Sequence, residues 1–219
     1  MKTPRFLLLP LAAALAFSAQ ATTPVPGLPE PLPPPGLDEA GVQQRAADAF
    51  FANLAPLCGQ AFAGRVVADT PPSANDPFST QPLVMHVREC DVDVVRISLH
   101  VGEDRSRTWV ITRTENGLRL KHDHRHADGS PDPVTMYGGD TTGAGSETRQ
   151  AFPVDAESIA MFEREGLAAS VSNTWAMEHA PGRRFLYELS RPNGRLFQIE
   201  FDLTAPQPVP PQAWGAIPR

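Results

Sequence analysis

The stretch Arg107-Thr-Trp-Val-Ile-Thr-Arg-Thr-Glu-Asn-Gly-Leu-Arg-Leu-Lys-His-Asp-His-Arg-His126 decides the fold, because a turn signal divides it into two β-type runs. The turn is Glu115-Asn116-Gly117, and Asn-Gly between two such runs favours a β-hairpin because both residues tolerate positive φ angles. From Leu118 to Lys121, leucines alternate with basic residues, as in a strand with one buried face. The stretch therefore predicts antiparallel strands over residues 107–114 and 117–126.

The same alternation continues on both sides of this hairpin. In an earlier run, apolar and polar residues alternate along one strand: Val95, Ile97, Leu99 and Val101 oppose Arg96, Ser98 and His100. A late run repeats the pattern: Phe197, Ile199, Phe201 and Leu203 oppose Gln198, Glu200 and Asp202. Further β-type runs lie near residues 62–68, 83–90, 133–138, 149–152, 170–179 and 184–190. The pattern predicts a mainly β fold, an antiparallel meander closing into a barrel of about 8–10 strands, since closure removes exposed edges.

Helical spacing appears at two places. Asp38 is a plausible N-cap for an N-terminal helix, whose apolar residues recur at helical intervals: Val42, Ala46, Phe50, Leu54 and Leu57. Asp155 is placed to cap one short late helix that carries Ile159 and Phe162 on one side. These helices are expected to cover the ends of the barrel.

The chain begins with features of a secretory signal. Lys2 and Arg5 precede an apolar run, and Ala19-Gln20-Ala21 has the small-x-small pattern of a cleavage site after Ala21. We therefore expect residues 1–21 to be a signal peptide and the protein to be periplasmic or secreted. The run is too short for a membrane span, and no other span is expected after cleavage.

Two proline-rich segments flank the predicted domain. Seven of the fifteen residues in 22–36 are proline, a composition that favours an extended leader over a helix or central strand. Residues 204–219 form a second proline-rich stretch, with five prolines in sixteen residues. A single β-rich domain is therefore expected over residues 37–203.

The net charge of the chain argues against nucleic acid as a partner. Lys2 and Arg5 leave with the signal, so 19 basic residues become 17 against 25 acidic ones, a net charge of −8. Binding of phosphate backbones depends on clustered lysine and arginine. Nucleic acid is therefore not an expected partner.

The two cysteines, Cys58 and Cys90, are most simply interpreted as one disulfide in an oxidising compartment. The bridge would tie the end of the N-terminal helix to an early strand. A redox pair is the alternative, but the Cys-x-x-Cys spacing typical of such pairs is missing.

The candidate site lies at the end of the central stretch. On a strand, His122, His124 and His126 share a face with the leucines, while the opposite face carries four charges that should meet solvent: Arg119, Lys121, Asp123 and Arg125. Three histidines would then line one wall of the interior. They could form a polar ligand-contacting wall, or they could be a hydrated strand end that binds nothing.

A metal site is a third interpretation of these histidines. Residues two apart on a strand lie close enough for both rings to reach one ion, whereas residues four apart do not. Either neighbouring pair of histidines would need a further ligand, for which His179 is the best candidate. No established metal-binding motif accompanies them, so no cofactor is assigned.

Aromatic residues in the predicted strands allow two interpretations. Trp109, Trp175 and Tyr187 could line a binding cavity together with the histidines. Large aromatic side chains also commonly fill a β core.

Several stretches resemble a group of secreted proteins from Gram-negative bacteria: the block from Cys58 to Cys90, His100 to Trp109, Leu118 to His126, and Met136-Tyr-Gly-Gly-Asp140. This resemblance implies export and assigns no catalytic residue. The strand pattern is also similar to that of calycin-type barrels, the lipocalins and their relatives, although the lipocalin Gly-x-Trp start is missing. That similarity implies a barrel that binds a small molecule in its interior.

The sequence thus predicts an exported barrel that binds a small molecule without catalysing a reaction. One alternative is a metal-dependent enzyme that uses strand histidines. Another is an envelope module that binds a protein partner and has no pocket.

Overall fold

The computed structural model describes residues 38–72 and 76–217. The predicted signal peptide (1–21) and proline-rich leader (22–36) lie outside the described residues. The described part is a mainly β unit with an N-terminal helix and a short later helix, as the sequence predicts. None of the described helices is both long and apolar enough to span a membrane.

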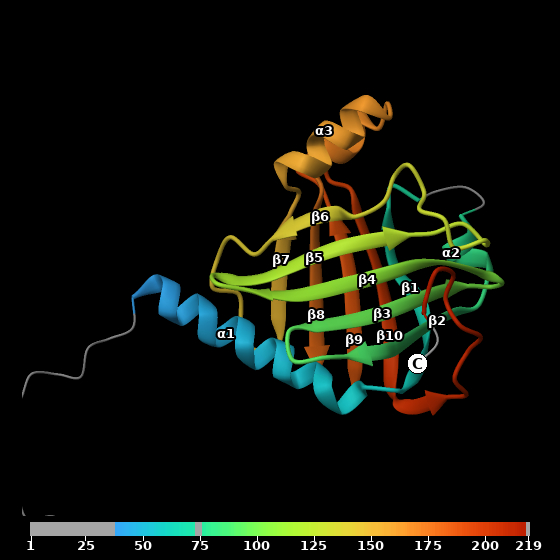
Figure 1. Cartoon of the computed structure of the whole chain (residues 1–219), viewed down its shortest axis with the longest axis horizontal. Coiled ribbons are helices and arrows are strands. Elements are labelled where there is room, and N and C mark those ends of the chain that lie inside the picture. Colours follow the sequence, from blue (N-terminus) through green and yellow to red (C-terminus); the bar gives the residue numbers. More distant parts are fainter. Residues whose placement is uncertain (1–37, 73–75, 218–219) are drawn as a thin grey trace, which may run out of the picture. The chain divides into compact units, whose positions relative to one another are not determined.

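Ten antiparallel strands form one sheet that curves into a nearly closed barrel (Figure 1). The strands are β1 (Ala61–Thr70), β2 (Leu83–Cys90), β3 (Val94–Val101), β4 (Asp104–Thr114), β5 (Gly117–His124), β6 (Tyr137–Asp140), β7 (Arg149–Pro153), β8 (Thr174–Ala180), β9 (Arg184–Ser190) and β10 (Leu196–Gln207). Their order in the sheet is β6-β5-β4-β3-β2-β1-β10-β9-β8-β7. This architecture is compatible with the calycin-like barrel that the strand pattern indicates.

The alternation that predicted the strands determines the core. The apolar faces of β3 and β10 are buried, and Glu115-Asn116 forms the turn of the β4–β5 hairpin, with Thr114 paired to Gly117. The outward-facing Ser98 and His100 are buried as well. The C-terminal segment, in which the Trp214 amide donates to the carbonyl of Arg105, packs back onto the strand next to β3.

Two glycines of β6 allow its backbone to lie close to both neighbours, β5 and β7. A Cβ atom on Gly138 would collide with the carbonyl oxygen of Leu120, and one on Gly139 would collide with that of Pro153. Only glycine lets the backbones approach so closely. The amide of Asp155, just after β7, donates to the carbonyl of Gly138 at 2.9 Å, which links the two edges.

Helix α1 (Glu39–Leu54) covers the barrel end that holds the β4–β5 turn. Asp38 is its N-cap, as predicted, and accepts from the amide of Gly41 at 2.8 Å. The helix buries four residues: Ala47, Phe50, Phe51 and Leu54. Val42, expected on the same apolar side, is instead 43% exposed because the first turns extend past the barrel edge.

The later helix, α3 (Ala156–Arg164), begins at its predicted cap, Asp155, which accepts from the amide of Ser158. Residues 170–172 were expected in a strand but belong to the 3-10 helix η2 (Ala168–Ser172), so β8 begins only at Thr174. Helix α2 (Pro77–Thr80) was not predicted. Its N-cap is Asp76, which is followed by proline at the first helical position.

Cys58 and Cys90 form the predicted disulfide, with their Cα atoms 6.2 Å apart. Cys58 follows the short 3-10 helix η1 (Ala55–Leu57) that continues α1, and Cys90 ends β2. The bridge therefore ties the N-terminal helix to an early strand, as expected. A structural disulfide is consistent with an exported protein.

Candidate functional site

A cavity of about 190 Å³ opens at the barrel end opposite to α1, next to α2. Strands β3, β4, β5, β6, β9 and β10 all contribute to its wall. The lining residues are Asp76, Phe78, Leu99, Arg107, Thr108, Trp109, His122, His124, Tyr137, Tyr187, Leu189, Arg195 and Phe197. An engineered cavity of about 150 Å³ holds benzene, so this one has room for a single ring with a small substituent.

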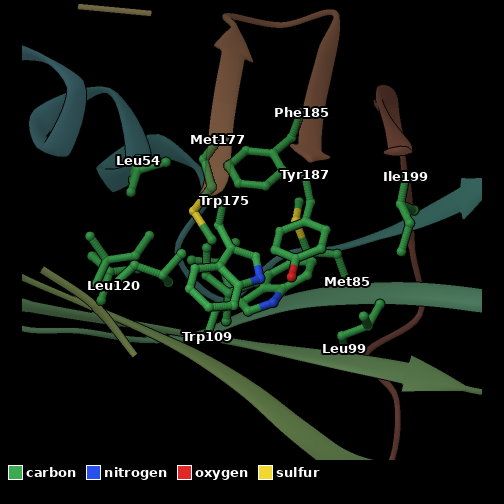
Figure 2. Close-up of a cluster of buried hydrophobic side chains, with 14 of the residues drawn as sticks. Leu54, Met85, Leu99, Trp109, Leu120, Trp175, Met177, Phe185, Tyr187 and Ile199 are labelled. Atoms are coloured by element: carbon green, nitrogen blue, oxygen red, sulfur yellow. The ribbon is translucent and has the colours of Figure 1, made fainter. Parts of the chain in front are cut away.

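The inner wall is aromatic and apolar (Figure 2). The rings of Trp109 and Tyr187 are stacked, with centroids 4.5 Å apart. Leu99 extends the apolar surface toward the mouth from the neighbouring strand. Trp175, one of the predicted site residues, packs behind this wall with its ring 5.0 Å from that of His122.

His122 is buried and held on both ring nitrogens. Its Nδ1 lies 3.2 Å from the carbonyl oxygen of Tyr137, and its Nε2 lies 2.9 Å from the hydroxyl oxygen of Tyr187. The Tyr137 ring is stacked on the imidazole at 4.7 Å. The ring orientation of His122 is therefore fixed before any ligand enters.

His124 lies one step nearer the mouth on the same face of β5. Its Nε2 is 3.2 Å from the Tyr137 hydroxyl, and its backbone amide donates to the Thr135 hydroxyl. Burial lowers the pKa of His124 to about 4, and the nearby Arg107 guanidinium contributes. Burial likewise lowers the pKa of His122 to about 3. Both imidazoles are therefore neutral near pH 7, and they offer hydrogen bonds without charge.

His126 does not join this wall. Strand β5 ends at His124, and the chain then enters a turn in which the amide of His126 donates to the carbonyl of Ser130. The side chain of His126 is 51% exposed and lies 3.9 Å from Asp132. The alternation that orients the first two histidines stops where the strand stops.

His179 lies at the opposite end of the barrel, near α1. Its amide donates to the carbonyl of Thr148, next to Glu147, whose carbonyl accepts from Asn53 of α1. The structure therefore does not bring His179 to the other predicted metal ligands. In the described part of the chain, no three His, Cys, Asp or Glu side chains are grouped closely enough to hold a metal ion.

The charged face of β5 is only partly exposed to solvent. Lys121 was expected to meet water but is buried, because its Nζ lies 2.7 Å from Asp155 and 3.3 Å from Glu157 at the start of α3. Arg119 remains half-exposed and pairs with Asp140 on the neighbouring strand.

Nine of the residues that line the cavity were not predicted as site residues, among them Phe78, Arg107, Tyr137, Arg195 and Phe197. The sequence pattern could have identified two of them. Arg107 is two residues from Trp109, and Arg195 is two residues from Phe197, so each arginine shares the inward face of its run. Phe78 reaches the cavity from the short helix α2 and Tyr137 from the four-residue strand β6, and neither element is long enough to show such a pattern.

Comparisons of the chain with protein-family models, with curated proteins and with solved structures gave no match.

Proposed function

We propose that this protein binds a small, ring-bearing organic molecule in the barrel cavity. The observation that carries the proposal is the combination of an aromatic inner wall with polar groups that converge on the same space. Trp109 and Leu99 provide apolar surface, and the hydroxyl groups of Tyr137 and Tyr187 supply polar atoms, held in place by His124 and His122. Small-molecule sites are typically concave, mostly apolar and fitted with a few positioned polar groups.

The hydrogen-bond network favours binding with little reorganisation. The Tyr187 hydroxyl is held by His122, and its ring is stacked on that of Trp109. Groups that are already ordered lose little conformational entropy when a ligand arrives. The size of the cavity restricts the ligand to about one ring and its substituents.

The other two functions have less support. For a metal-dependent enzyme, both nitrogens of His122 are already engaged by protein groups, and His179 lies at the far end of the barrel. For an interaction module without a pocket, the interior should be filled by side chains, whereas a cavity of about 190 Å³ is present. We therefore favour binding without catalysis.

We also propose that the protein works outside the cytoplasm, in the periplasm or after secretion. The apolar N-terminal run, the Ala-Gln-Ala pattern and the Cys58–Cys90 disulfide all support export. The stretches that resemble secreted proteins of Gram-negative bacteria agree with this assignment.

A cavity-filling variant tests the binding function. Leu189 lines the mouth and is only half-buried, so Leu189→Trp should occupy the cavity without disrupting the core. Leu167→Trp makes the same change at a position that is 38% exposed and outside the cavity wall. Binding of phenol, benzamide and benzoate can be followed by ligand-observed NMR.

We expect at least one of the three compounds to bind the wild-type protein with a Kd below about 1 mM. The Leu189→Trp variant should lose that binding, and the Leu167→Trp variant should keep it. Absence of binding to the wild-type protein, or equal binding to both variants, would contradict the proposal.

A further inference from the structure

Two arginines and two phenylalanines form a row along the cavity wall. The guanidinium of Arg107 lies 5.2 Å from the ring centre of Phe78, and that of Arg195 lies 5.6 Å from the ring centre of Phe197. The two phenyl rings meet edge to face at 5.4 Å. All four side chains line the cavity, so both cations are held in place by stacking where a ligand would enter.

These arginines set the charge of the cavity wall. His122 and His124 are neutral near pH 7, which leaves two arginines and one aspartate, Asp76, as the charged lining residues. The carboxylate of Asp76 accepts from the amide of Phe78 as the cap of α2. The two guanidiniums are therefore the cationic groups of the lining, and Asp76 is its anionic group.

The positive field reaches the polar end of the cavity. The guanidinium of Arg107 contributes to lowering the pKa of His124, and it acts in the same direction on the hydroxyls of Tyr137 and Tyr187. Arg107 thus lies close enough to all three groups to influence a ligand that contacts them.

Each arginine retains hydrogen-bonding capacity beyond its ion pair. Arg107 pairs with Asp104 through Nη1, and Arg195 uses its Nη1 for Asp69 and for the carbonyl of Pro71. Neither of these aspartates is part of the cavity wall. A guanidinium carries five N–H donors in a planar fork, and that fork fits a carboxylate.

We propose that the ligand of this cavity is a small aromatic monocarboxylate, with its carboxylate bound by Arg107 and Arg195. This inference rests on the binding function proposed above. The aromatic ring would lie against Trp109 and Leu99, where the wall is apolar. A second negative charge on the ligand would be opposed by Asp76 and by the aspartates that pair with the two arginines, so we expect a single negative charge.

Benzoate and benzamide separate the effect of charge from that of shape, because they share the ring and the planar substituent. We expect calorimetry to show wild-type protein binding benzoate about tenfold more tightly than benzamide. The preference should shrink when salt is raised to about 1 M, where charges more than about 3 Å apart are screened.

Three variants test which side chains cause the preference for benzoate over benzamide. Arg107→Gln and Arg195→Gln should each bring the benzoate affinity close to that of benzamide. Arg65→Gln removes the same charge from a side chain that is 72% exposed and outside the cavity wall, so it should keep the wild-type preference.

The outcomes separate this inference from the binding function. Equal affinity of wild-type protein for benzoate and benzamide would overturn the carboxylate assignment and leave the binding function standing. A benzoate preference that survives in both Arg107→Gln and Arg195→Gln would also overturn it. Failure of both compounds to bind, together with phenol, would remove the binding function and this inference with it.

Discussion

The Nε2 atom of His122 lies 2.9 Å from the hydroxyl oxygen of Tyr187, so this ring nitrogen and the hydroxyl share one hydrogen bond. On the other side of the ring, Nδ1 faces the carbonyl oxygen of Tyr137, which can only accept. The hydrogen of the neutral imidazole is therefore on Nδ1, and Nε2 accepts from Tyr187. The Tyr187 ring is stacked on that of Trp109, so His122, Tyr187 and Trp109 form one packed group in the cavity wall.

Removing the tyrosine hydroxyl should destabilise the protein. The Tyr187→Phe variant leaves Nε2 of His122 without this partner in a buried setting. We expect a loss of about 1–3 kcal/mol in the free energy of unfolding, measured by urea titration. The double variant His122→Leu/Tyr187→Phe should lose less than the sum of the single variants, because it removes both partners. Additive losses would contradict the coupling.

The buried histidines should make stability depend on pH. Burial lowers the pKa of His122 to about 3, and burial lowers those of His124 and His100 to about 4, whereas an unfolded histidine titrates near 6.5. Between about pH 4 and 6.5 the unfolded chain therefore binds more protons than the folded protein. Stability should be full above about pH 6.5 and should fall as the pH decreases through this window.

A variant isolates the contribution of one histidine. His122→Gln removes one group that takes up a proton when the protein unfolds. The slope of unfolding free energy against pH should therefore decrease by up to about 1.4 kcal/mol per pH unit. Urea titrations at several pH values between about 4 and 7 measure the slope independently of any overall loss of stability. An unchanged slope in this variant would contradict the burial of a neutral His122.

Much of the barrel could be predicted because local pattern and tertiary structure agree. Along β3 and β10, apolar residues at every second position are those the structure buries, and the turn between Thr114 and Gly117 fixes the register of the central hairpin. Asp38 and Asp155 signalled helix starts in the same local way. These features depend on neighbours within a few residues, so one sequence is sufficient to find them.

Other features depend on contacts that a single strand does not encode. Lys121 alternates outward as expected, but α3 covers it, and the position of α3 depends on closure of the barrel at Gly138 and Gly139. The alternating pattern of the sequence continues to His126, but strand β5 has already ended at His124. Tyr137 reaches the cavity from a strand of only four residues, too short to show a period.

The disulfide should contribute measurably to stability. It closes a loop with a sequence separation of 32 residues, for which loop-closure entropy gives about 3–4 kcal/mol. Replacing both cysteines by serine should lower the unfolding free energy by about that amount, and reducing the wild-type protein should have the same effect. Thiol titration of the unfolded, unreduced protein should detect no free thiol, and detection of two would contradict the bridge.

The burial of Lys121 can be tested chemically, because it is the only lysine in the chain after Lys2. Its side chain is 10% exposed, and its ammonium group pairs with Asp155 and Glu157. An amine-reactive acetylating reagent should therefore modify Lys121 slowly in the folded protein and rapidly in urea, as followed by mass spectrometry of the peptide that contains it.

Asp155→Asn weakens the closer pair and the cap of α3, so it should increase the labelling rate of the folded protein. Glu157→Gln changes a partner that is 84% exposed and should have a smaller effect. If Lys121 of the folded wild-type protein were labelled as fast as in urea, α3 could not cover it as described.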